Sequence, residues 1–592
     1  MAKPWALAAV VFIPIALVGI EVKTYASDTD GAVKAIDAPF CECNIKIDGT
    51  IGESEWAHAV AITDIVQLQP RRGEAPTEST CFYLLYDRDN LYIGFKCFDD
   101  SSEIKASATI RDHESIGWDD GIVAIISPTG DKLTGYGFSV NALGTQRDYR
   151  LDEDGNVFDP EWDGIWESAT RLTADRYEGE IRIPFSNFRF ANDSGQWGLN
   201  ILRGIVSKME VDSWVLVSSA SKISELGRLS LNLDKINYRY SHEDAFRLTP
   251  YFSQPLTRGP SKIGLENITY RISSGTSLQL TINPDYAQIE ADVDEFNLDK
   301  LPIYLDEKRR FFIEEMALFE TAIPLMYTRT MESIHSGMKL SARVGKTDVG
   351  ILAVATRDEV AGATGKTEKV VSARIRNFHE PASLGVLGIA NWNPSNQVLA
   401  LDGSVSLPWG LHGSVQLAQS WIDGQRSKIL HHTKIARNVN EGLIFELSHT
   451  HIPSDFEDVR GFLRMKNLLD FESSVAYRLF LNKYGIRLIS PYLAYGSWQT
   501  EDHRVILEGG AANISVDFER NISLYASVSS ERRIWQNTKY RNRLYSMSLS
   551  RSPGGYNYLT VAYYFGKYYG GYLHYPSLSP VSYTHLTLPT KA

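Results

Sequence analysis

The sequence predicts an all-β chain in two parts, a β-sandwich followed by an antiparallel β-barrel of the outer-membrane type. Short strands with period-two alternation, separated by turn residues, fill the first part. After Leu233 the segments become longer and have one apolar and one polar face. No stretch beyond the N-terminal region reaches the ~18 consecutive apolar residues of a membrane-spanning helix, so any later membrane contact must use strands.

The N-terminus has the pattern of an export signal. Lys3 provides a positive charge, residues 5–20 are almost entirely apolar, and Thr24-Tyr25-Ala26 places small residues at the expected cleavage site. We therefore expect residues 1–26 to be a signal peptide cleaved after Ala26. A retained N-terminal anchor is the alternative.

Residues 35–235 form the predicted sandwich. Phe82 and Leu84 alternate with Tyr83 and Leu85, and Asp87-Arg88-Asp89-Asn90 provides a hairpin turn. Further signals are the apolar run 122–126, which suits a strand buried in a sandwich core, and the strand ending at Pro184.

Residues 245–580 form the predicted barrel domain, which we expect to be truncated. Two-faced segments recur at 338–344, 371–376, 401–407, 411–417 and 522–528, and tyrosines crowd residues 556–572. Alternating segments of about ten residues and interfacial aromatic belts are typical of transmembrane barrels, and the length suggests on the order of 14–16 strands. A soluble sandwich or propeller with one solvated face is the alternative.

Residues 581–590 match the conceptual translation of a sequencing-library adapter. We interpret residues 581–592 as read-through and exclude them from fold reasoning, as one excludes a fusion scar.

Charge and cysteine placement narrow the function. The net charge of −12 argues against nucleic-acid binding, which needs a basic face. The four cysteines lie early in the chain, and an exported domain permits disulfides. Cys81 and Cys97 flank the hairpin and can bridge it, or each can reach Cys41 or Cys43. A zinc site formed by all four cysteines is a more specific alternative, but the spacing of the cysteines is irregular for such a site.

Ordered motifs in the first part resemble carbohydrate-binding modules of family 9. In chain order they are Ile47-Asp48-Gly49, Glu55-Trp56, Leu91-Tyr92-Ile93-Gly94-Phe95 with Asp99-Asp100, Trp118-Asp119-Asp120, Gly135-Tyr136-Gly137-Phe138 with Asn141 and Gly144, Trp162 with Trp166, and Glu180-Ile181-Arg182-Ile183-Pro184-Phe185. The resemblance implies a sugar-binding sandwich.

The second part resembles a family of unknown function that joins a family 9-like domain to an outer-membrane-type barrel. The motifs are residues 283–292, Asn297-Leu298 and residues 307–314. The chain departs from that pattern at Asp306 and Arg310, where prolines are usual, and at Glu315, where glycine is typical. These departures put in doubt any role of that tight turn that would be inferred from the resembled family.

Sugar binding needs an aromatic platform for the apolar face of the ring and a few fixed polar groups for its hydroxyls. The candidate platforms are Trp118, Trp162 and Trp166, and the candidate hydroxyl partners are Arg111, Asp119, Asp120, Asn141 and Asp148. Trp162 is the preferred platform because its loop is rich in Pro, Asp and Gly. Core packing is the alternative for Trp166, and loop capping or pairing with Arg111 is the alternative for Asp119 and Asp120.

A structural Ca²⁺ site is a further hypothesis. Asp152, Asp154 and Asn156 place oxygen ligands at alternate positions before and after Gly155. The resemblance favours it, since family 9 modules hold structural calcium. A solvated turn is the alternative.

The sequence therefore favours a carbohydrate-binding protein of the outer membrane that captures or admits glycans, with a glycan or polysaccharide and outer-membrane lipid as partners. Two alternatives are an exported glycoside hydrolase and a channel with no sugar role. We do not favour hydrolysis, because Glu290, Asp292, Glu307 and Glu314 have no recognisable catalytic context.

Overall fold

The computed structural model describes residues 33–43, 45–188, 195–236, 246–253, 262–273, 275–284, 301–331, 333–357, 367–392, 394–535, 538–554 and 557–581. The chain divides into two units, Met1–Val33 and Lys34–Ala592, and all elements below belong to the second. The expected signal peptide, the motif residues 285–292 and 297–298, and nearly all of the adapter tail lie outside the described residues.

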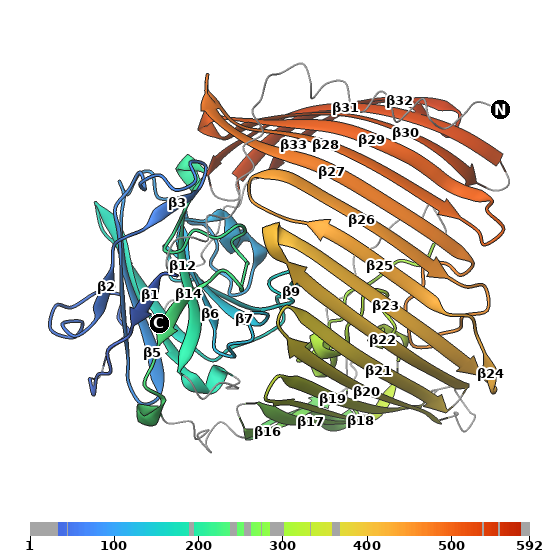
Figure 1. Ribbon diagram of the computed structural model, residues 1–592, viewed down its shortest axis with the longest axis horizontal. Coiled ribbons are helices and arrows are strands. Elements are labelled where there is room, and N and C mark those ends of the chain that lie inside the picture. Colours follow the sequence, from blue (N-terminus) through green and yellow to red (C-terminus); the bar gives the residue numbers. More distant parts are fainter. Residues whose placement is uncertain are drawn as a thin grey trace. The chain divides into compact units, whose positions relative to one another are not determined.

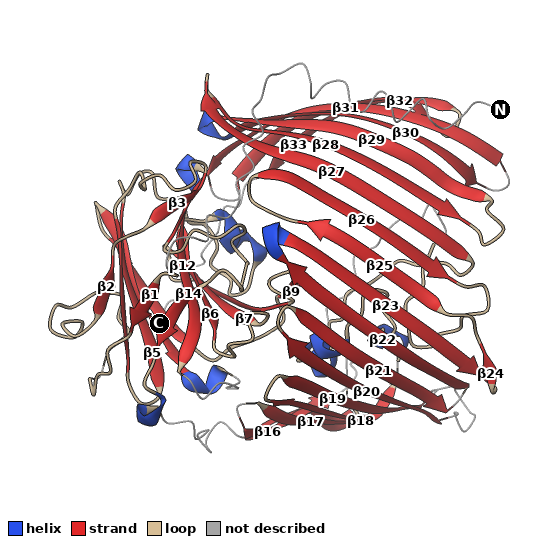
Figure 2. Cartoon of the chain, viewed as in Figure 1, coloured by secondary structure: helices blue, strands red, loops and turns tan. Residues whose placement is uncertain are grey.

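The first part is a sandwich of two sheets (Figures 1 and 2). One sheet has the order β1-β14-β12-β6-β7-β8-β9, with β13 pairing both β12 and β3, and the other has the order β10-β11-β5-β4-β2. The strands are β1 (Ala35–Asp37), β2 (Val60–Ile62), β3 (Val66–Gln69), β4 (Thr80–Tyr86), β5 (Asn90–Phe98), β6 (Gly121–Ser127), β7 (Gly135–Asn141), β8 (Gln146–Asp152), β9 (Val157–Asp159), β10 (Glu167–Leu172), β11 (Arg176–Pro184), β12 (Gln196–Ile205), β13 (Glu210–Ser213) and β14 (Gly227–Ser230). Short 3₁₀ turns are η2 (Glu114–Trp118), η3 (Phe185–Asn187), η4 (Val206–Lys208) and η5 (Leu233–Lys235).

Alternating side chains from both sheets fill the sandwich core. Phe82 pairs with Phe95 and Leu84 with Ile93 across the β4–β5 hairpin, and all four side chains are buried in one cluster. The predicted hairpin turn, the buried strand at residues 122–126 and the strand end at Pro184 are confirmed. Period-two alternation therefore places one face of each strand between the sheets.

The second part is one antiparallel sheet of 19 strands in sequence order, from β15 to β33. The strands are β15 (Phe246–Ser253), β16 (Lys262–Ser273), β17 (Thr276–Ile282), β18 (Ile334–Val344), β19 (Thr347–Arg357), β20 (Thr367–His379), β21 (Ala382–Trp392), β22 (Ser395–Leu407), β23 (Leu411–Ile422), β24 (Gln425–Arg426), β25 (Leu430–Arg437), β26 (Gly442–Ile452), β27 (Leu468–Lys483), β28 (Ile486–Gln499), β29 (Val505–Phe518), β30 (Ile522–Trp535), β31 (Thr538–Gly554), β32 (Asn557–Tyr568) and β33 (Gly571–Val581). Helical pieces are α1 (Arg310–Ile313), η6 (Met316–Phe319), η7 (Thr328–Thr330), η8 (Pro408–Gly410) and η9 (Glu519–Asn521).

The long sheet has more strands than the 14–16 expected from its length. Tight turns account for the difference, since only residues 345–346 join β18 to β19. Among the described residues β15 pairs only with β16 and β33 only with β32, so these strands are the two edges of the sheet. The order and length of the strands are those of the predicted barrel domain, although the described sheet is not closed.

Exposure in the long sheet is inverted relative to a soluble protein. On β18 the polar Lys339, Ser341 and Arg343 are buried, whereas the apolar Met338 and Val344 are exposed. The same inversion recurs on β20, where Arg374 and Arg376 are buried and Ile375 is exposed. The sequence predicted the two faces correctly, and the polar face is the covered one.

A segment from residues 301–331 covers part of the inner face. Phe311, Phe312 and Phe319 lie in a buried cluster with inward side chains of the sheet, including Leu352 and Val398. The inner face is therefore apolar where this segment packs against it and polar elsewhere.

The sandwich meets the long sheet through buried ion pairs. Asp131 Oδ2 accepts from an Arg343 guanidinium nitrogen at 2.6 Å, and Arg150 donates to Asp348 at 3.1 Å. Glu153, in the turn between β8 and β9, bonds Arg376. Because all these side chains are at most 15% exposed, water screens these contacts little.

Within the described residues, no helix is both long and apolar enough to cross a membrane.

Candidate functional site

Arg111 organises the loops at one end of the sandwich. Its Nη2 donates to Asp148 Oδ1, Asp163 Oδ1 and Gly164 O, each at 2.9 Å, and its Nη1 donates to Gln146 at 3.2 Å. These partners come from the start of β8 and from the loop between β9 and β10. One partly exposed guanidinium therefore fixes two segments that are distant in sequence.

Asp148 is the buried partner of this guanidinium. Burial raises the pKa of Asp148 to about 6, although Gly164 N and Arg111 oppose the shift. Carboxylate oxygens of Asp112, Asp148 and Asp163 lie within 4.8 Å of one another. Arg111 forms an ion pair with all three carboxylates, so it supplies the positive charge that this acidic group needs.

The three candidate tryptophans have different environments. Trp118, at the end of η2, is 63% exposed, so its ring is available for stacking. Trp162 is half-buried, and its ring centroid lies 4.8 Å from that of Tyr136 and 5.8 Å from that of Phe138. Trp166 is only 4% exposed and belongs to the core. The platform hypothesis is therefore corrected for Trp166, whose buried ring cannot stack on a sugar.

Asp119 and Asn141 hold a loop in place. Asp119 accepts from Ser107 N at 2.9 Å, from Ala108 N at 2.8 Å and from Asn141 Nδ2 at 2.9 Å. Asn141 Oδ1 in turn accepts from Leu143 N and Thr145 N, and its Nδ2 donates to Ala108 O. Both side chains are buried. Their proposed role as sugar-hydroxyl partners is corrected, because these internal bonds use their polar atoms.

Asp120 has the same kind of role. It is buried, and its carboxylate accepts from Lys105 N and, at 2.9 Å, from Val206 N. Loop capping, the alternative reading of the Asp119-Asp120 pair, therefore describes both residues. Of the predicted hydroxyl partners, Arg111 remains partly exposed.

Several family 9-like motifs converge on one buried carboxylate. Glu180 accepts from Asp48 N at 2.9 Å, from Gly49 N at 3.1 Å and from Trp56 Nε1 at 2.9 Å. Gly49 has φ +84°, and a Cβ there would lie 2.8 Å from the backbone of Thr170. These motif residues therefore maintain the scaffold of the sandwich.

The predicted calcium ligands do not form a ligand set. Asp152 pairs with Arg150 at 3.0 Å. Asp154 is paired with Lys222 and also accepts from Ser224 N at 2.7 Å, while Asn156 donates to Glu153 O at 2.7 Å. The calcium hypothesis is corrected at these residues, because two cationic side chains already neutralise the carboxylates.

The cysteines form a local bridge. Cys41 and Cys43 are disulfide-bonded, with Cα atoms 5.2 Å apart. Cys81 and Cys97 are free, so neither pairing considered for them, with each other or with Cys41 and Cys43, is formed. Cys97 pairs with Thr80 and Cys81 with Lys96, which makes the cysteines adjacent in register on opposite faces of the strands. Burial raises the pKa of Cys97 to about 11.

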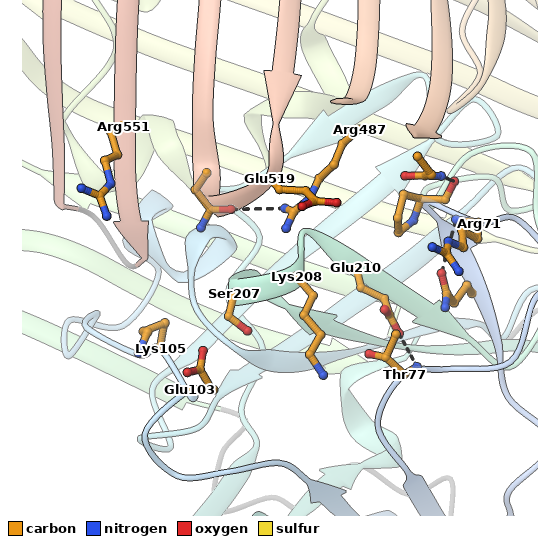
Figure 3. A pocket seen from close by; sticks show the side chains of 14 residues that line it. Arg71, Thr77, Glu103, Lys105, Ser207, Lys208, Glu210, Arg487, Glu519 and Arg551 are labelled. Atoms are coloured by element: carbon orange, nitrogen blue, oxygen red, sulfur yellow. Dashed lines mark hydrogen bonds between the residues drawn. The ribbon is translucent and has the colours of Figure 1, made fainter. Parts of the chain in front are cut away.

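A cavity of about 570 Å³ lies between sandwich loops and turns of the long sheet (Figure 3). Its lining includes Arg71, Lys208, Glu210, Arg487 and Arg551 and contains no aromatic residue. This cavity therefore offers no aromatic ring on which a sugar could stack.

The two described carboxylates considered for hydrolysis, Glu307 and Glu314, are engaged in other contacts. Glu290 and Asp292 lie outside the described residues. Burial would raise the pKa of Glu307, but hydrogen bonds from Arg309 and Thr328 hold that pKa below its usual range. Glu314 accepts from Arg310 at 2.8 Å and from Gln279 at 2.6 Å. Glu307 therefore does not resemble a general acid, whose pKa must be raised.

Sequence reasoning missed the residues that connect the two parts. Asp131, Arg150 and Glu153 of the sandwich pair with Asp348 or with arginines on the inner face of the long sheet. The signal was present as arginine at successive inward positions of β20, Arg374 and Arg376. Their partners come from segments remote in sequence, which periodicity alone does not identify.

Together these observations define an all-β protein that joins a two-sheet sandwich to one long antiparallel sheet of 19 described strands. A sequence model of the family described as a domain of unknown function, DUF5916, matches residues 246–346. The match includes the start of the long sheet and the inner segment, so the predicted resemblance in the second part is confirmed there.

Three solved structures are similar to parts of the chain. A family 9 carbohydrate-binding module from Caldicellulosiruptor kristjanssonii, in complex with cellotriose, is 15% identical, and the match covers 35% of this chain and 96% of that one at a TM-score of 0.26. OccK9 (OpdG) from Pseudomonas aeruginosa is 12% identical, with 75% and 97% covered and a TM-score of 0.26. The P pilus usher PapC translocation pore is 8% identical, with 88% and 97% covered and a TM-score of 0.31.

No curated protein sequence matches the chain. At these TM-scores the solved structures carry no argument about activity. Function is therefore argued from the residues.

Proposed function

We propose that this chain is a carbohydrate-binding protein of the outer membrane, in which the sandwich captures glycans at the cell envelope. The observation that carries the proposal is the exposed ring of Trp118 at the loop end that also contains the Arg111 hub. An indole ring stacks on the apolar face of a sugar, and a guanidinium donates to hydroxyl oxygens. The partly exposed Arg111 provides hydrogen-bond donors, and the exposed Asp163 provides acceptors.

The inverted exposure of the long sheet supports the membrane location. Leu384, Leu401 and Val415 are exposed on neighbouring strands, whereas Ser383 and Gln416 are buried. A contiguous exposed aliphatic face favours contact with lipid over contact with water. A polar covered face is equally typical of a transmembrane barrel.

The tyrosine-rich end supports an interfacial belt only in part. Tyr563 and Tyr564 are both exposed, but successive residues of a strand face opposite sides of the sheet. Tyr563 shares its face with the exposed Leu559 and Val561, so it lies on the aliphatic side. Only alternate residues of this strand therefore lie on the aliphatic face and can belong to the interfacial belt that we expected.

Substitution of Trp118 tests the proposal. In the full chain in detergent, Trp118→Ala should weaken binding of an array-identified glycan by ~1–3 kcal/mol, by analogy with base–aromatic stacking. Isothermal titration calorimetry measures this change. Trp392→Ala is the matched control, because Trp392 is a similarly exposed tryptophan on the long sheet, at 60%. Equal affinity in the two variants, or no glycan bound by the parent chain, would refute the proposal.

A further inference from the structure

A second cavity, of about 530 Å³, lies on the inner face of the long sheet. Its walls come from three parts of the chain: the β8–β9 turn at Glu153, the inner segment at Glu320, and inward residues of β20 to β27. Its volume falls in the ~300–1,000 Å³ range of small-ligand sites. None of the residues that line this cavity belongs to the loop end that contains Trp118 and Arg111.

Polar atoms on this lining have no hydrogen-bond partner among the described residues. They are Nε of Arg374, Nε of Arg376 and Nδ1 of His412. Their side chains are 1%, 8% and 8% exposed, so water reaches them poorly. An unsatisfied buried donor is unfavourable, and a ligand atom bonded to it would relieve that cost.

The unpartnered atoms differ in kind. His412 Nε2 faces Glu153 Oε2 at 3.3 Å, and a carboxylate can only accept, so Nε2 carries the ring proton. In this tautomer Nδ1 is an acceptor, whereas the two arginine Nε–H groups are donors. A hydroxyl group both donates and accepts, so it satisfies this mixed set. A phosphate or carboxylate accepts only and would face the Nδ1 lone pair.

Charge around the cavity is already balanced. Arg374 binds both carboxylate oxygens of Asp402, Arg376 bonds Glu153, and Lys434 lies 2.8 Å from Glu446. Each of these cations has its own carboxylate, so little attraction remains for a free anion. We infer that this cavity is a second, internal binding site for a neutral saccharide. The inference goes beyond glycan capture by the sandwich and does not depend on the Trp118 site.

The test fills the cavity in a chain whose sandwich site is disabled. The background is full-length Trp118→Ala in detergent, and the neutral probes are cellobiose, maltose and lactose, each titrated calorimetrically against digalacturonate as the anionic probe. Ala436, on β25, lines the cavity, whereas its neighbour Ile435 is exposed on the opposite face. We expect Ala436→Trp to weaken binding of a neutral disaccharide at least tenfold and Ile435→Trp to leave it unchanged.

Ser414→Phe, on β23, is a second filling variant in case Ala436→Trp does not fold. Absence of neutral disaccharide binding in the Trp118→Ala background, equal affinity in the filled and control variants, or tighter binding of digalacturonate would overturn the inference. Failure of the sandwich proposal is distinguishable, because the parent chain and Trp118→Ala would then bind alike while the filling variants still lose affinity.

Discussion

At the residue scale, solvent exposure distinguishes the tryptophans that occur in similar sequence motifs. Trp118 is free to contact a ligand, whereas Trp162 packs on Tyr136 and Phe138. Both occur in family 9-like motifs, so the motif alone does not tell a platform from a packing residue. The preferred platform therefore moves from Trp162 to Trp118.

Truncating Trp162 should cost stability more than affinity. Trp162→Ala removes a ring that the core rings contact, and we expect roughly 1–3 kcal/mol of lost stability, below the ~3–5 kcal/mol of a fully buried tryptophan. Trp118→Ala should leave stability unchanged. Urea unfolding of the sandwich compares the two, and equal midpoints for Trp162→Ala and the parent would contradict this assignment.

Asp212 should make the sandwich more stable at low pH. Burial, together with the neighbouring Glu210, raises the pKa of Asp212 to about 8. The folded state therefore binds this proton more tightly than the unfolded state, whose carboxyl titrates near ~3.9. The resulting stabilisation is fully present below about pH 4 and is lost as the pH rises from about 4 to about 8.

Asp212→Asn removes this dependence, since an amide cannot ionise. We expect the variant to exceed the parent in stability by at least ~1 kcal/mol at pH 8 and to match it near pH 4. Asp234→Asn, at an exposed aspartate, is the control. Urea midpoints at the two pH values give the comparison, and parallel pH profiles for parent and Asp212→Asn would contradict the prediction.

At the element scale, the alternation in the sequence predicted which side of each strand is apolar. The alternation alone suggests that Ser404, on the polar face, tolerates a new charge better than the neighbouring Val405. The structure contradicts this, because Ser404 is buried and its hydroxyl lies 2.8 Å from the Ser383 hydroxyl. Ser404 is packed against Ser383, so an arginine at this position would have to displace its neighbours.

A better matched pair lies on β30, where both faces are partly open. Val528 is exposed on the aliphatic side, and Ser529 points inward beside it. Val528→Arg should cost up to ~2–4 kcal/mol if the position lies near the bilayer midplane, whereas Ser529→Arg should cost less. Heat-modifiable gel mobility of membrane-inserted protein provides the readout. Equal loss of folded protein in both variants would argue against a lipid-facing side.

The limits of the sequence are clearest where contacts are long-range. Strand faces and tight turns such as Asp87-Arg88-Asp89-Asn90 are local, and they were predicted. The inner segment at residues 301–331 has no periodicity, so its packing against the sheet was not predicted. Asp119 and Asp120 accept hydrogen bonds from backbone N–H groups, which every residue type except proline has. The sequence therefore does not identify those partners.

At the scale of the whole molecule, the buried ion pairs determine how firmly the sandwich holds the long sheet. Arg343 lies between Asp131 of the sandwich, at 2.6 Å, and Asp348 of the sheet, at 3.7 Å. Asp131 Oδ1 also accepts from Leu133 N and Thr134 N. An asparagine at this position would retain the Oδ1 acceptor while losing the charge.

Removing the arginine alone should therefore destabilise the contact between sandwich and sheet more than removing both charges. Arg343→Met leaves the Asp131 carboxylate buried without its cation, which typically costs ~3–5 kcal/mol. The Asp131→Asn/Arg343→Met double variant should recover a large part of this loss, because no uncompensated charge remains at that contact. Glu380→Gln is the control, since its pair with Lys132 also joins sandwich to sheet but is about half exposed and should contribute only ~0–1 kcal/mol. Limited trypsin digestion of the full chain in detergent, read as the rate at which the sandwich is released, should rank Arg343→Met fastest, the double variant intermediate, and Glu380→Gln level with the parent. If Arg343→Met and Glu380→Gln released the sandwich at the same rate, the buried pairs would not hold the two parts together.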